Sequence, residues 1–520
     1  MYSKEDERVL LNFFTNLDKP IFGAKNFHPE VWALMQARYS RSTEGMRESF
    51  LNLLKEDPAN YEELKKIVLS DKQETTDVAL KKAISFMEKW VLGYGHSSVS
   101  EGAVVGFGLE GVSILASKVI EDNRLCSFIE KSTRYVSFGR NSFLIPKELQ
   151  ESKHKTEVED LFDSLFQTYM DLHEPVLEYV QKTVPLTEGV NEAAWKRSTA
   201  ARRFDSVRYL LPASTKTSLG WTVNARQLAH AINKLLSHPL SEMREIGVSL
   251  QGEGSQLLPS LLKYTGEKTY FKETEKDMRI KTKLCLSNTI QPGGEKVCLV
   301  SSPEDSEEKI IAAILFRYSN VSFEDCLSKA RALSDAEKEE VFEVFLQKQE
   351  AFDSPLRELE HSDFVFEVMM DYGAFRDIQR HRLVTQTNQL LTCFHGFETP
   401  PDIIGAGAQK KYAEVMNHAK EVFEKVWEED NYSAQYVVPL AYKHRFLIKG
   451  NLREFYYLIK LRSQPQGHFS YVELAKKMHS ILSEKYPIAM KHCICAQNLE
   501  ELGRLKAEER LERKIKRREI

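Results

Sequence analysis

The chain has 520 residues, of which 42% are hydrophobic and 28% charged, and its formal net charge is −4. The length fits two to four domains with proper cores. The charge excludes a general attraction to nucleic acid or anionic membranes, so phosphate binding needs local arginine clusters. No apolar run reaches about 18 residues, the first residues lack the apolar stretch of a secretory signal, and the cysteines are mostly scattered. We therefore expect a reduced, cytoplasmic protein with neither a membrane nor a nucleic acid among its partners.

Helical periodicity dominates the chain. Apolar residues recur at three- and four-residue spacing, which predicts helices, in the segments 155–182, 226–263, 410–428 and 451–483. Shorter β-like runs occur at 103–109, 297–301 and 364–370. The polar stretch 265–296 contains Pro-Gly-Gly and is a candidate linker. The densely charged segment 499–520 predicts a solvated helix or a frayed tail, with no function implied.

Several landmarks recur in the same order. Tyr209-Leu-Leu-Pro212 precedes Asn224-Ala-Arg226, Tyr436-Val-Val-Pro439 precedes Asn451-Leu-Arg453, and Tyr and Arg are 17 residues apart in both. Upstream, Arg38-Tyr39-Ser40 is matched by Arg317-Tyr318-Ser319, and between these markers lie the related segments 121–135 and 379–394. The order predicts an internal duplication. We place the first repeat at 1–264, the linker at 265–296, the second repeat at 297–498 and the tail at 499–520.

Arginine-rich clusters are the candidate binding residues. In Arg380-His381-Arg382, neighbouring cationic groups repel one another unless an anion compensates. Guanidinium groups suit phosphate and also stack on flat rings, so a pyrophosphate or an aromatic cofactor is the expected partner. A solvated helix face remains the alternative for this cluster alone.

Two further clusters lie in the first repeat. Glu130, Ser132 and Arg134 alternate, so in an extended or loop backbone they face one way and could read a ribose and a phosphate together. Arg226 opens a patterned helix for which Asn224 is a plausible N-cap, and an arginine beside helix-start amides makes an anion site. An ordinary polar turn and a structural arginine are the respective alternatives.

At these residues the sequence resembles the flavin-dependent thymidylate synthases, the ThyX family. The family signature is R-H-R-x-x-S-x-N-x-x-S-x-R, preceded by an H-x-S/T-x-x-E element. The first repeat carries that element from His96 to Glu101 and then a degenerate signature in which Arg124, Ser127, Ser132 and Arg134 match. There Asp122, Asn123 and Ile129 replace the first Arg, the His and the Asn. The second repeat keeps Arg380-His381-Arg382 and has Thr385 at the first Ser position, but it loses the end of the signature at Leu391 and Cys393.

The resemblance implies an α+β fold of two ThyX-like repeats, each a small, mostly antiparallel sheet with a helical layer, helix-rich overall. It implies FAD contacts at Arg380, His381 and Arg382, with Ser40, Ser98 and Glu101 as weaker candidates. It implies dUMP contacts at Glu130, Ser132, Arg134 and Arg226. Ser132 and Arg134 are also the candidate catalytic residues. No base is identified that would make Ser132 a nucleophile, so a binding role is preferred. No metal is expected.

The implied reaction is the reductive methylation of dUMP to dTMP, with FAD as cofactor and with NADPH and methylenetetrahydrofolate as co-substrates. Neither repeat holds a complete set of site residues, so the sites are expected to be composites of both repeats, in a homodimer that acts as a pseudo-tetramer. Two alternatives remain. One is a catalytically inactive flavin- and nucleotide-binding protein with a regulatory or structural role, because Asp122 would repel phosphate. The other is a flavin-dependent methyltransferase acting on a different uracil compound, against which the acidic charge argues where that compound is RNA.

Overall fold

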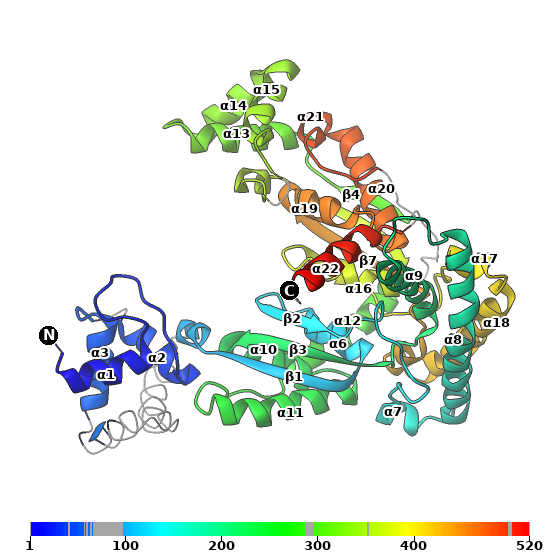
Figure 1. Cartoon of the computed structure of the whole chain (residues 1–520), viewed down its shortest axis with the longest axis horizontal. Coiled ribbons are helices and arrows are strands. Elements are labelled where there is room, and N and C mark those ends of the chain that lie inside the picture. Colours follow the sequence, from blue (N-terminus) through cyan, green and yellow to red (C-terminus); the bar gives the residue numbers. More distant parts are fainter. Residues whose placement is uncertain are drawn as a thin grey trace. The chain divides into compact units, whose positions relative to one another are not determined.

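The structure is a computed structural model that describes residues 2–39, 42–56, 58, 61–62, 65, 97–286, 296–350, 353–497 and 502–518 (Figure 1). The chain forms two compact units. Unit 1 comprises Met1–Glu110, Leu125–Glu130 and Ser218–Asn288, and unit 2 comprises Gly111–Arg124, Lys131–Thr217 and Thr289–Ile520. The first repeat therefore contributes to both units. Among the helices in the described ranges, none combines the length and the apolar character needed to cross a membrane.

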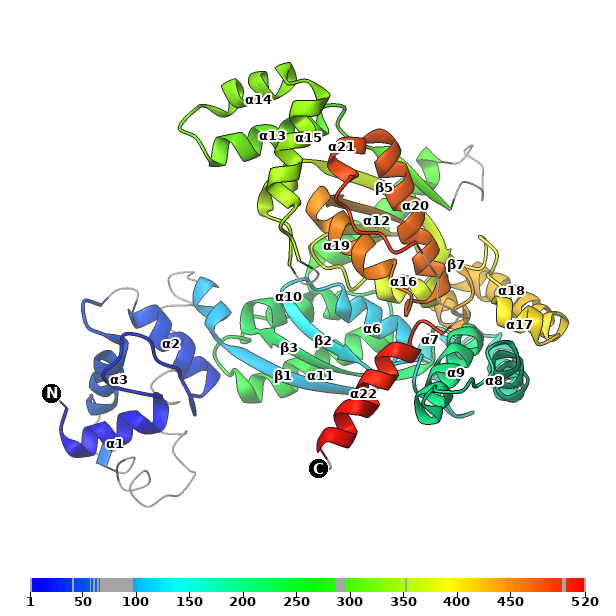
Figure 2. The same cartoon turned by 45° about the horizontal axis from the view of Figure 1, so that its top comes forward.

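Unit 1 is built around a three-stranded sheet of order β1-β3-β2, in which β2 and β3 are antiparallel. The strands are β1 (Val104–Ser113), β2 (Cys126–Glu130) and β3 (Lys216–Asn224). Helices α10 (Ala225–Leu236) and α11 (Ser241–Leu257) pack on each other beside this sheet (Figures 1 and 2). The other helices of the unit are α1 (Lys4–Phe13), α2 (Pro29–Tyr39), α3 (Met46–Lys55), η2 (Ser97–Gly102) and α12 (Thr269–Cys285). Helix α12 lies in the segment that the sequence marks as a linker.

Unit 2 contains a four-stranded antiparallel sheet of order β4-β5-β7-β6. Its strands are β4 (Val297–Ser301), β5 (Asp363–Asp371), β6 (Thr385–Asn388) and β7 (Lys443–Asn451). The first repeat supplies α6 (Ile114–Glu121), α7 (Lys147–Gln150), α8 (Lys155–Thr183), α9 (Glu192–Val207) and η3 (Arg208–Leu210). The second supplies α13 (Ser306–Arg317), α14 (Phe323–Ala332), α15 (Asp335–Leu346), η4 (Arg357–His361), α16 (Tyr372–Ile378), α17 (Pro401–Gly405), α18 (Gln409–Glu429), η5 (Ser433–Val437), α19 (Leu452–Arg462), α20 (Phe469–Lys485) and α21 (Pro487–Met490). Helix α22 (Leu505–Arg518) ends the described chain.

The order of elements confirms the α+β fold and the duplication. Apart from α9, which only the first repeat has between α8 and η3, the run β1, α6, β2, α7, α8, η3, β3, α10, α11 is repeated as β5, α16, β6, α17, α18, η5, β7, α19, α20. The side chains of Asn224 and Asn451 both accept a hydrogen bond from the first turn of the helix that follows, so the predicted N-cap occurs in each repeat. The predicted strands at 103–109, 297–301 and 364–370 form, while β2, β3, β6 and β7 were not predicted.

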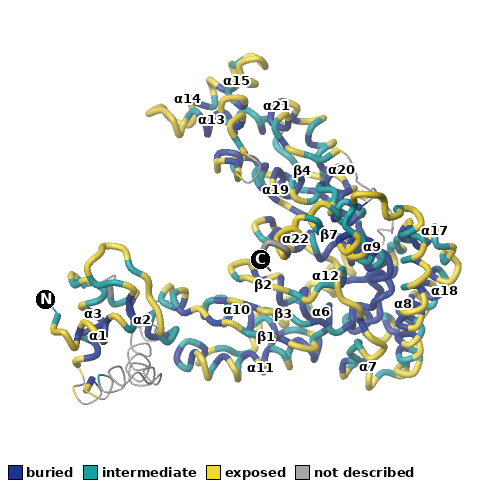
Figure 3. The backbone as a smooth tube through the Cα atoms, viewed as in Figure 1, coloured by how far each residue is buried: buried dark blue, intermediate teal, exposed yellow. Residues whose placement is uncertain are grey.

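The motifs that repeat in sequence pair with each other inside unit 2. The amide of Ala213 donates to the carbonyl of Val438 and the amide of Leu440 donates to the carbonyl of Leu211, both at 2.9 Å, around an antiparallel bridge between Pro212 and Pro439. Residues 204–215 and 433–442 are buried without interruption (dark blue in Figure 3). Because each segment pairs with its own equivalent in antiparallel fashion, the repeats meet here about a local pseudo-two-fold axis. Helices α8 and α18 also lie side by side.

Candidate functional site

The remains of the two signatures lie in contact within unit 2. Arg124 Nη2 donates to Thr385 Oγ1 at 3.0 Å, which joins the first matching arginine of one signature to the threonine of the other. Arg376 Nη1 donates to Thr133 Oγ1 at 3.3 Å, and both of these side chains are buried. The segment that carries Ser132 and Arg134 thus packs against α16, the helix that leads into Arg380-His381-Arg382.

A buried ion pair holds Arg134. Its Nε and Nη2 donate to the two carboxylate oxygens of Asp205 at 2.6 and 3.0 Å, and its Nη1 donates to Tyr471 Oη at 2.9 Å. The backbone at 133–135 is a turn, with the amide of Arg134 donating to Ser132 Oγ, so the extended alternation considered from the sequence does not set a common face. Glu130 is the last residue of β2 and belongs to unit 1.

Asp377 connects the residues of the two repeats electrostatically. Its carboxylate lies 3.7 Å from Arg380 Nη1. Burial acts to raise the pKa of Asp377, but Arg134, Arg208, Arg462 and Arg380 together hold it below its ordinary value. Arg134, a nucleotide candidate, and Arg380, a flavin candidate, therefore act on the same carboxylate.

His381, the middle residue of the R-H-R triplet, is 4% exposed and neutral. Burial, reinforced by the charge of Arg462, lowers its pKa to about 3. Arg462 Nε donates to His381 Nε2 at 2.9 Å, so the ring proton resides on Nδ1, which has no hydrogen-bond partner within the described part of the chain. The neighbouring Arg380 is about half exposed and Arg382 is partly buried.

Sequence reasoning missed Arg208, although it directly precedes the repeated Tyr209 motif and is replaced by Gln435 in the second repeat. Arg208 is 2% exposed, and its Nε and Nη2 have no hydrogen-bond partner among the described residues. A buried guanidinium with two unused donors is costly unless an anion completes it. Asp205 was missed as well. Burial raises the pKa of its carboxyl, although Arg134 and Arg208 act in the opposite direction.

The predicted residues of unit 1 form a second cluster. Arg226 Nη1 lies 2.6 Å from Glu101 Oε1, and both side chains are about half exposed. The second repeat has the equivalent pair, Arg453 with Glu360 at 2.7 Å. Ser98 is exposed in η2, and Ser40 lies outside the described residues. The structure therefore brings together a predicted dUMP residue and a predicted flavin residue, in an ion pair that both repeats contain.

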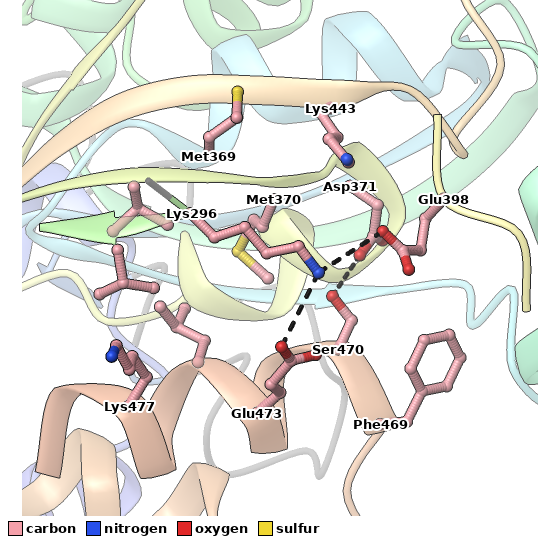
Figure 4. A pocket seen from close by; sticks show the side chains of 13 residues that line it. Lys296, Met369, Met370, Asp371, Glu398, Lys443, Phe469, Ser470, Glu473 and Lys477 are labelled. Atoms are coloured by element: carbon pink, nitrogen blue, oxygen red, sulfur yellow. Dashed lines mark hydrogen bonds and ion pairs between the residues drawn. The ribbon is translucent and has the colours of Figure 1, made fainter. Parts of the chain in front are cut away.

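A cavity of about 420 Å³ lies between α20 and the end of β5 (Figure 4). Figure 4 shows Lys296 between Glu398 and Glu473, and Ser470 bonded to Asp371, the N-cap residue of α16. None of the residues predicted from the sequence lines this cavity. Phe469 separates it from a smaller cavity beside Asp205, because this ring lines both.

The unused donors test whether a flavin and a nucleotide fit here. His381 Nδ1 and the two nitrogens of Arg208 are buried donors that an acceptor-rich ligand would satisfy. The arginines Arg134, Arg208, Arg380 and Arg462 outnumber the carboxylates Asp205 and Asp377, so the cluster is positively charged even with both acids ionised. Phosphorylated ligands have the complementary chemistry.

Comparison with known proteins finds the same family module in both halves of the chain. The family described as thymidylate synthase complementing protein, Thy1, matches the chain twice, at residues 30–260 and 298–488. A UPF0159 protein of Chlamydia muridarum is 34% identical over 98% of this chain and 98% of its own length, and one of Chlamydia pneumoniae is 32% identical over 91% and 92%. A flavin-dependent thymidylate synthase of Clostridium tetani is 23% identical over 36% of this chain and 73% of its own length. The chain therefore belongs to the Thy1 family of thymidylate synthase complementing proteins and carries the family module twice.

Proposed function

We propose that this protein is a flavin-dependent thymidylate synthase that methylates dUMP reductively to dTMP. The co-substrates are methylenetetrahydrofolate and NADPH, the cofactor is FAD, and the site is built from both repeats. One observation carries the proposal: the two signature segments contact each other, and Arg134 and Arg380 act on the same carboxylate of Asp377. The kinship with flavin-dependent thymidylate synthases supports the choice of reaction.

In this proposal the first repeat binds the nucleotide. Arg134 and the buried Arg208 supply the guanidinium groups for the phosphate and the uracil oxygens of dUMP, where negative charge is stabilised by donors fixed in advance. Ser132 Oγ already accepts a hydrogen bond from the amide of Arg134, which suits a side chain that fixes the turn and contacts the ligand. Glu130 and Arg226 belong to unit 1, and they are proposed as dUMP contacts on the family resemblance alone.

The second repeat binds the flavin. His381 donates from Nδ1, which requires the neutral ring that its lowered pKa ensures, while Arg380 and Arg382 contact the phosphates or the ring. Ser98, Glu101 and Ser40 are the weaker candidates from the first repeat. When bound, FAD supplies the hydride chemistry. The side chains of this protein orient the ligands and exclude water. Two chains supply four modules, so we also propose a homodimer.

A second candidate function is binding without turnover. Two observations favour it. First, a carboxylate, Asp122, follows α6 at the position where the second repeat has the first arginine of the R-H-R triplet after α16. Second, the guanidinium of Arg134 is already bonded to the carboxylate of Asp205. Such a protein would bind FAD and dUMP but leave the uracil C5–H bond intact.

Release of tritium from 5-tritiated dUMP distinguishes the two. With FAD, NADPH and methylenetetrahydrofolate, the purified protein is expected to release tritium, and Arg380→Ala is expected to abolish the release. Arg140→Ala is the matched control, because this exposed arginine forms an ion pair with exposed Asp163 at 3.3 Å and belongs to neither proposed ligand set. A wild-type protein that retains FAD and dUMP but releases no tritium supports the second candidate, and one that binds neither ligand contradicts both.

A further inference from the structure

The C-terminal segment Leu502–Arg518 lies beyond the second family match, which ends at residue 488. The sequence predicts a solvated helix or a frayed tail without a function for 499–520, yet two residues just before α22 are buried: Leu502 and Arg504 are each 8% exposed. Arg197 on α9 pairs with Glu508 at 2.7 Å and with Glu512 at 2.6 Å, which fixes α22 along α9 (Figure 2).

Close backbone packing fixes the start of this segment. A Cβ atom on Gly503 would lie 1.9 Å from the carbonyl oxygen of Pro465, so only glycine allows this approach. Arg504 then reaches inward, with its guanidinium 5.3 Å from the ring centre of Tyr135. The start of the segment is therefore packed closely against other residues of unit 2.

Arg504 reaches the carboxylate that holds Arg134. Arg504 Nη2 lies 2.7 Å from Asp205 Oδ2, the oxygen to which Arg134 Nη2 donates at 3.0 Å. The side chains of Arg504 and Asp205 are 10% and 12% exposed. Both residues line a cavity of about 290 Å³, together with Arg202 and Phe469. One buried carboxylate is thus shared between an arginine of the family signature and an arginine of the extension.

We propose that Arg504 is a positioning residue of the nucleotide site, which neutralises Asp205 so that Arg134 can exchange this carboxylate for the anionic substrate. The inference rests on the proposed function, because it assigns Arg134 to the nucleotide. A buried carboxylate with a single arginine partner holds that partner strongly, since neither charge has a solvated alternative. A second arginine takes over the carboxylate charge, and the free energy needed to release the first one falls.

The test is a double-mutant cycle on the whole protein. Dissociation constants for dUMP and for inorganic phosphate are measured calorimetrically for wild type, Arg504→Gln, Asp205→Asn and the double variant. Arg504→Gln is expected to raise both constants about tenfold, equal to about 1.4 kcal/mol. Asp205→Asn in the same chain should restore them, because Arg134 then has no carboxylate to leave. Arg504→Lys, which keeps the charge, should recover part of the loss, and Arg510→Gln, exposed on the same helix, should change nothing.

A purely structural role for Arg504 gives a different pattern. In that case Arg504→Gln lowers stability, and Asp205→Asn in the same chain does not restore binding, which overturns the inference even if tritium release establishes the proposed function. Binding of inorganic phosphate that follows the expected cycle, in a protein that does not bind dUMP, keeps the inference and rejects the proposed substrate. Should Arg504→Gln fail to fold, the Asp205→Asn variant decides. We expect this variant to bind both anions at least as tightly as the wild type, and weaker binding would contradict the exchange.

Discussion

The arginines of the candidate site differ in what already holds them. Arg134 and Arg504 share Asp205, Arg462 is bonded to His381, and Arg208 keeps two nitrogens without a partner among the described residues. Burial makes each of these arrangements consequential, because an unpaired ionic group away from water costs several kcal/mol. The positive charge of the site is therefore already partly compensated by neighbouring side chains. A ligand binds by replacing some of these side chains as partners of the arginines.

Division of labour between the repeats can be tested with single substitutions. Arg134→Gln is expected to weaken dUMP binding at least about tenfold while FAD stays bound, because a signature guanidinium is lost and the amide carries no charge. Arg382→Gln should weaken FAD binding and spare dUMP. Flavin absorbance after gel filtration and calorimetric titration with dUMP provide the two measurements. If both substitutions cost the same ligand, the assignment of nucleotide to one repeat and flavin to the other is wrong.

Protonation of His381 links the site to acid stability. Its pKa is lowered from 6.5 to about 3, so between these values the unfolded chain binds a proton that the folded chain does not. The stabilising contribution is complete above pH 6.5 and is lost as the pH falls, at about 1.4 kcal/mol per pH unit. The free energy of unfolding, measured with denaturant across this pH window, should depend less steeply on pH in His381→Gln, by an amount that corresponds to about one proton. His444, whose pKa is also about 3, keeps a residual slope. An unchanged slope would mean that His381 is protonated in the folded protein.

At the scale of single elements, the attachment of α22 depends on one glycine. Gly503→Ala places a methyl group on the carbonyl of Pro465, so the segment must shift and the contact of Arg504 with Asp205 is broken. We expect a loss of about 1–3 kcal/mol in the free energy of unfolding and faster proteolysis at the C-terminal end. Gly266→Ala is the control, because its added methyl group meets nothing within 4 Å. Equal protease resistance of the two variants would show that α22 is held without this contact.

Elements with a local signal were predictable, and those that depend on distant partners were less so. The long amphipathic runs predicted α8 and α18 to within one residue at each end, because apolar residues at helical spacing suffice. The central strands β3 and β7 were missed although Leu219, Trp221 and Val223 alternate with exposed or half-buried residues. Gly220 in β3 and the lysines of β7 weakened that pattern. Pairing of β3 with β1 and β2, and of β7 with β5 and β6, makes these segments strands.

The pairs Arg226–Glu101 and Arg453–Glu360 show what a residue-level alignment leaves out. Arg453 was recognised as the equivalent of Arg226, but its role was open because the surrounding motif is lost. The structure gives it the same partner type, and it adds a bond from Arg453 Nε to the carbonyl of Pro355 at 2.7 Å. The second repeat lacks the nucleotide residues but keeps the ion pair, which indicates that the pair also has a structural role. It joins α10 to η2 in the first repeat and α19 to η4 in the second.

Across the whole molecule, the duplication was visible in the sequence and the junction was not. The 17-residue spacing from Tyr209 to Arg226 and from Tyr436 to Arg453 revealed two copies. The pairing of Leu211 with Leu440 and of Ala213 with Val438 joins segments more than 200 residues apart, and no local pattern specifies it. No local pattern marks Asp205 either, because its role depends on its contacts with Arg134 and Arg504.

Ligand stoichiometry is the prediction that belongs to the whole chain. The first repeat has lost the R-H-R triplet and the second has lost the last Ser and Arg of the signature, so only one set of each kind remains. We expect each chain to bind one FAD and one dUMP, where two complete modules would bind two of each. Flavin released by heat and measured against protein concentration gives the first ratio, and calorimetric titration with dUMP gives the second. A ratio near two for FAD would mean that the segment around Asp122 binds the pyrophosphate of a second flavin despite its negative charge. The Asp122→Arg variant restores an arginine at the first signature position and provides the reference for a chain with a second flavin site.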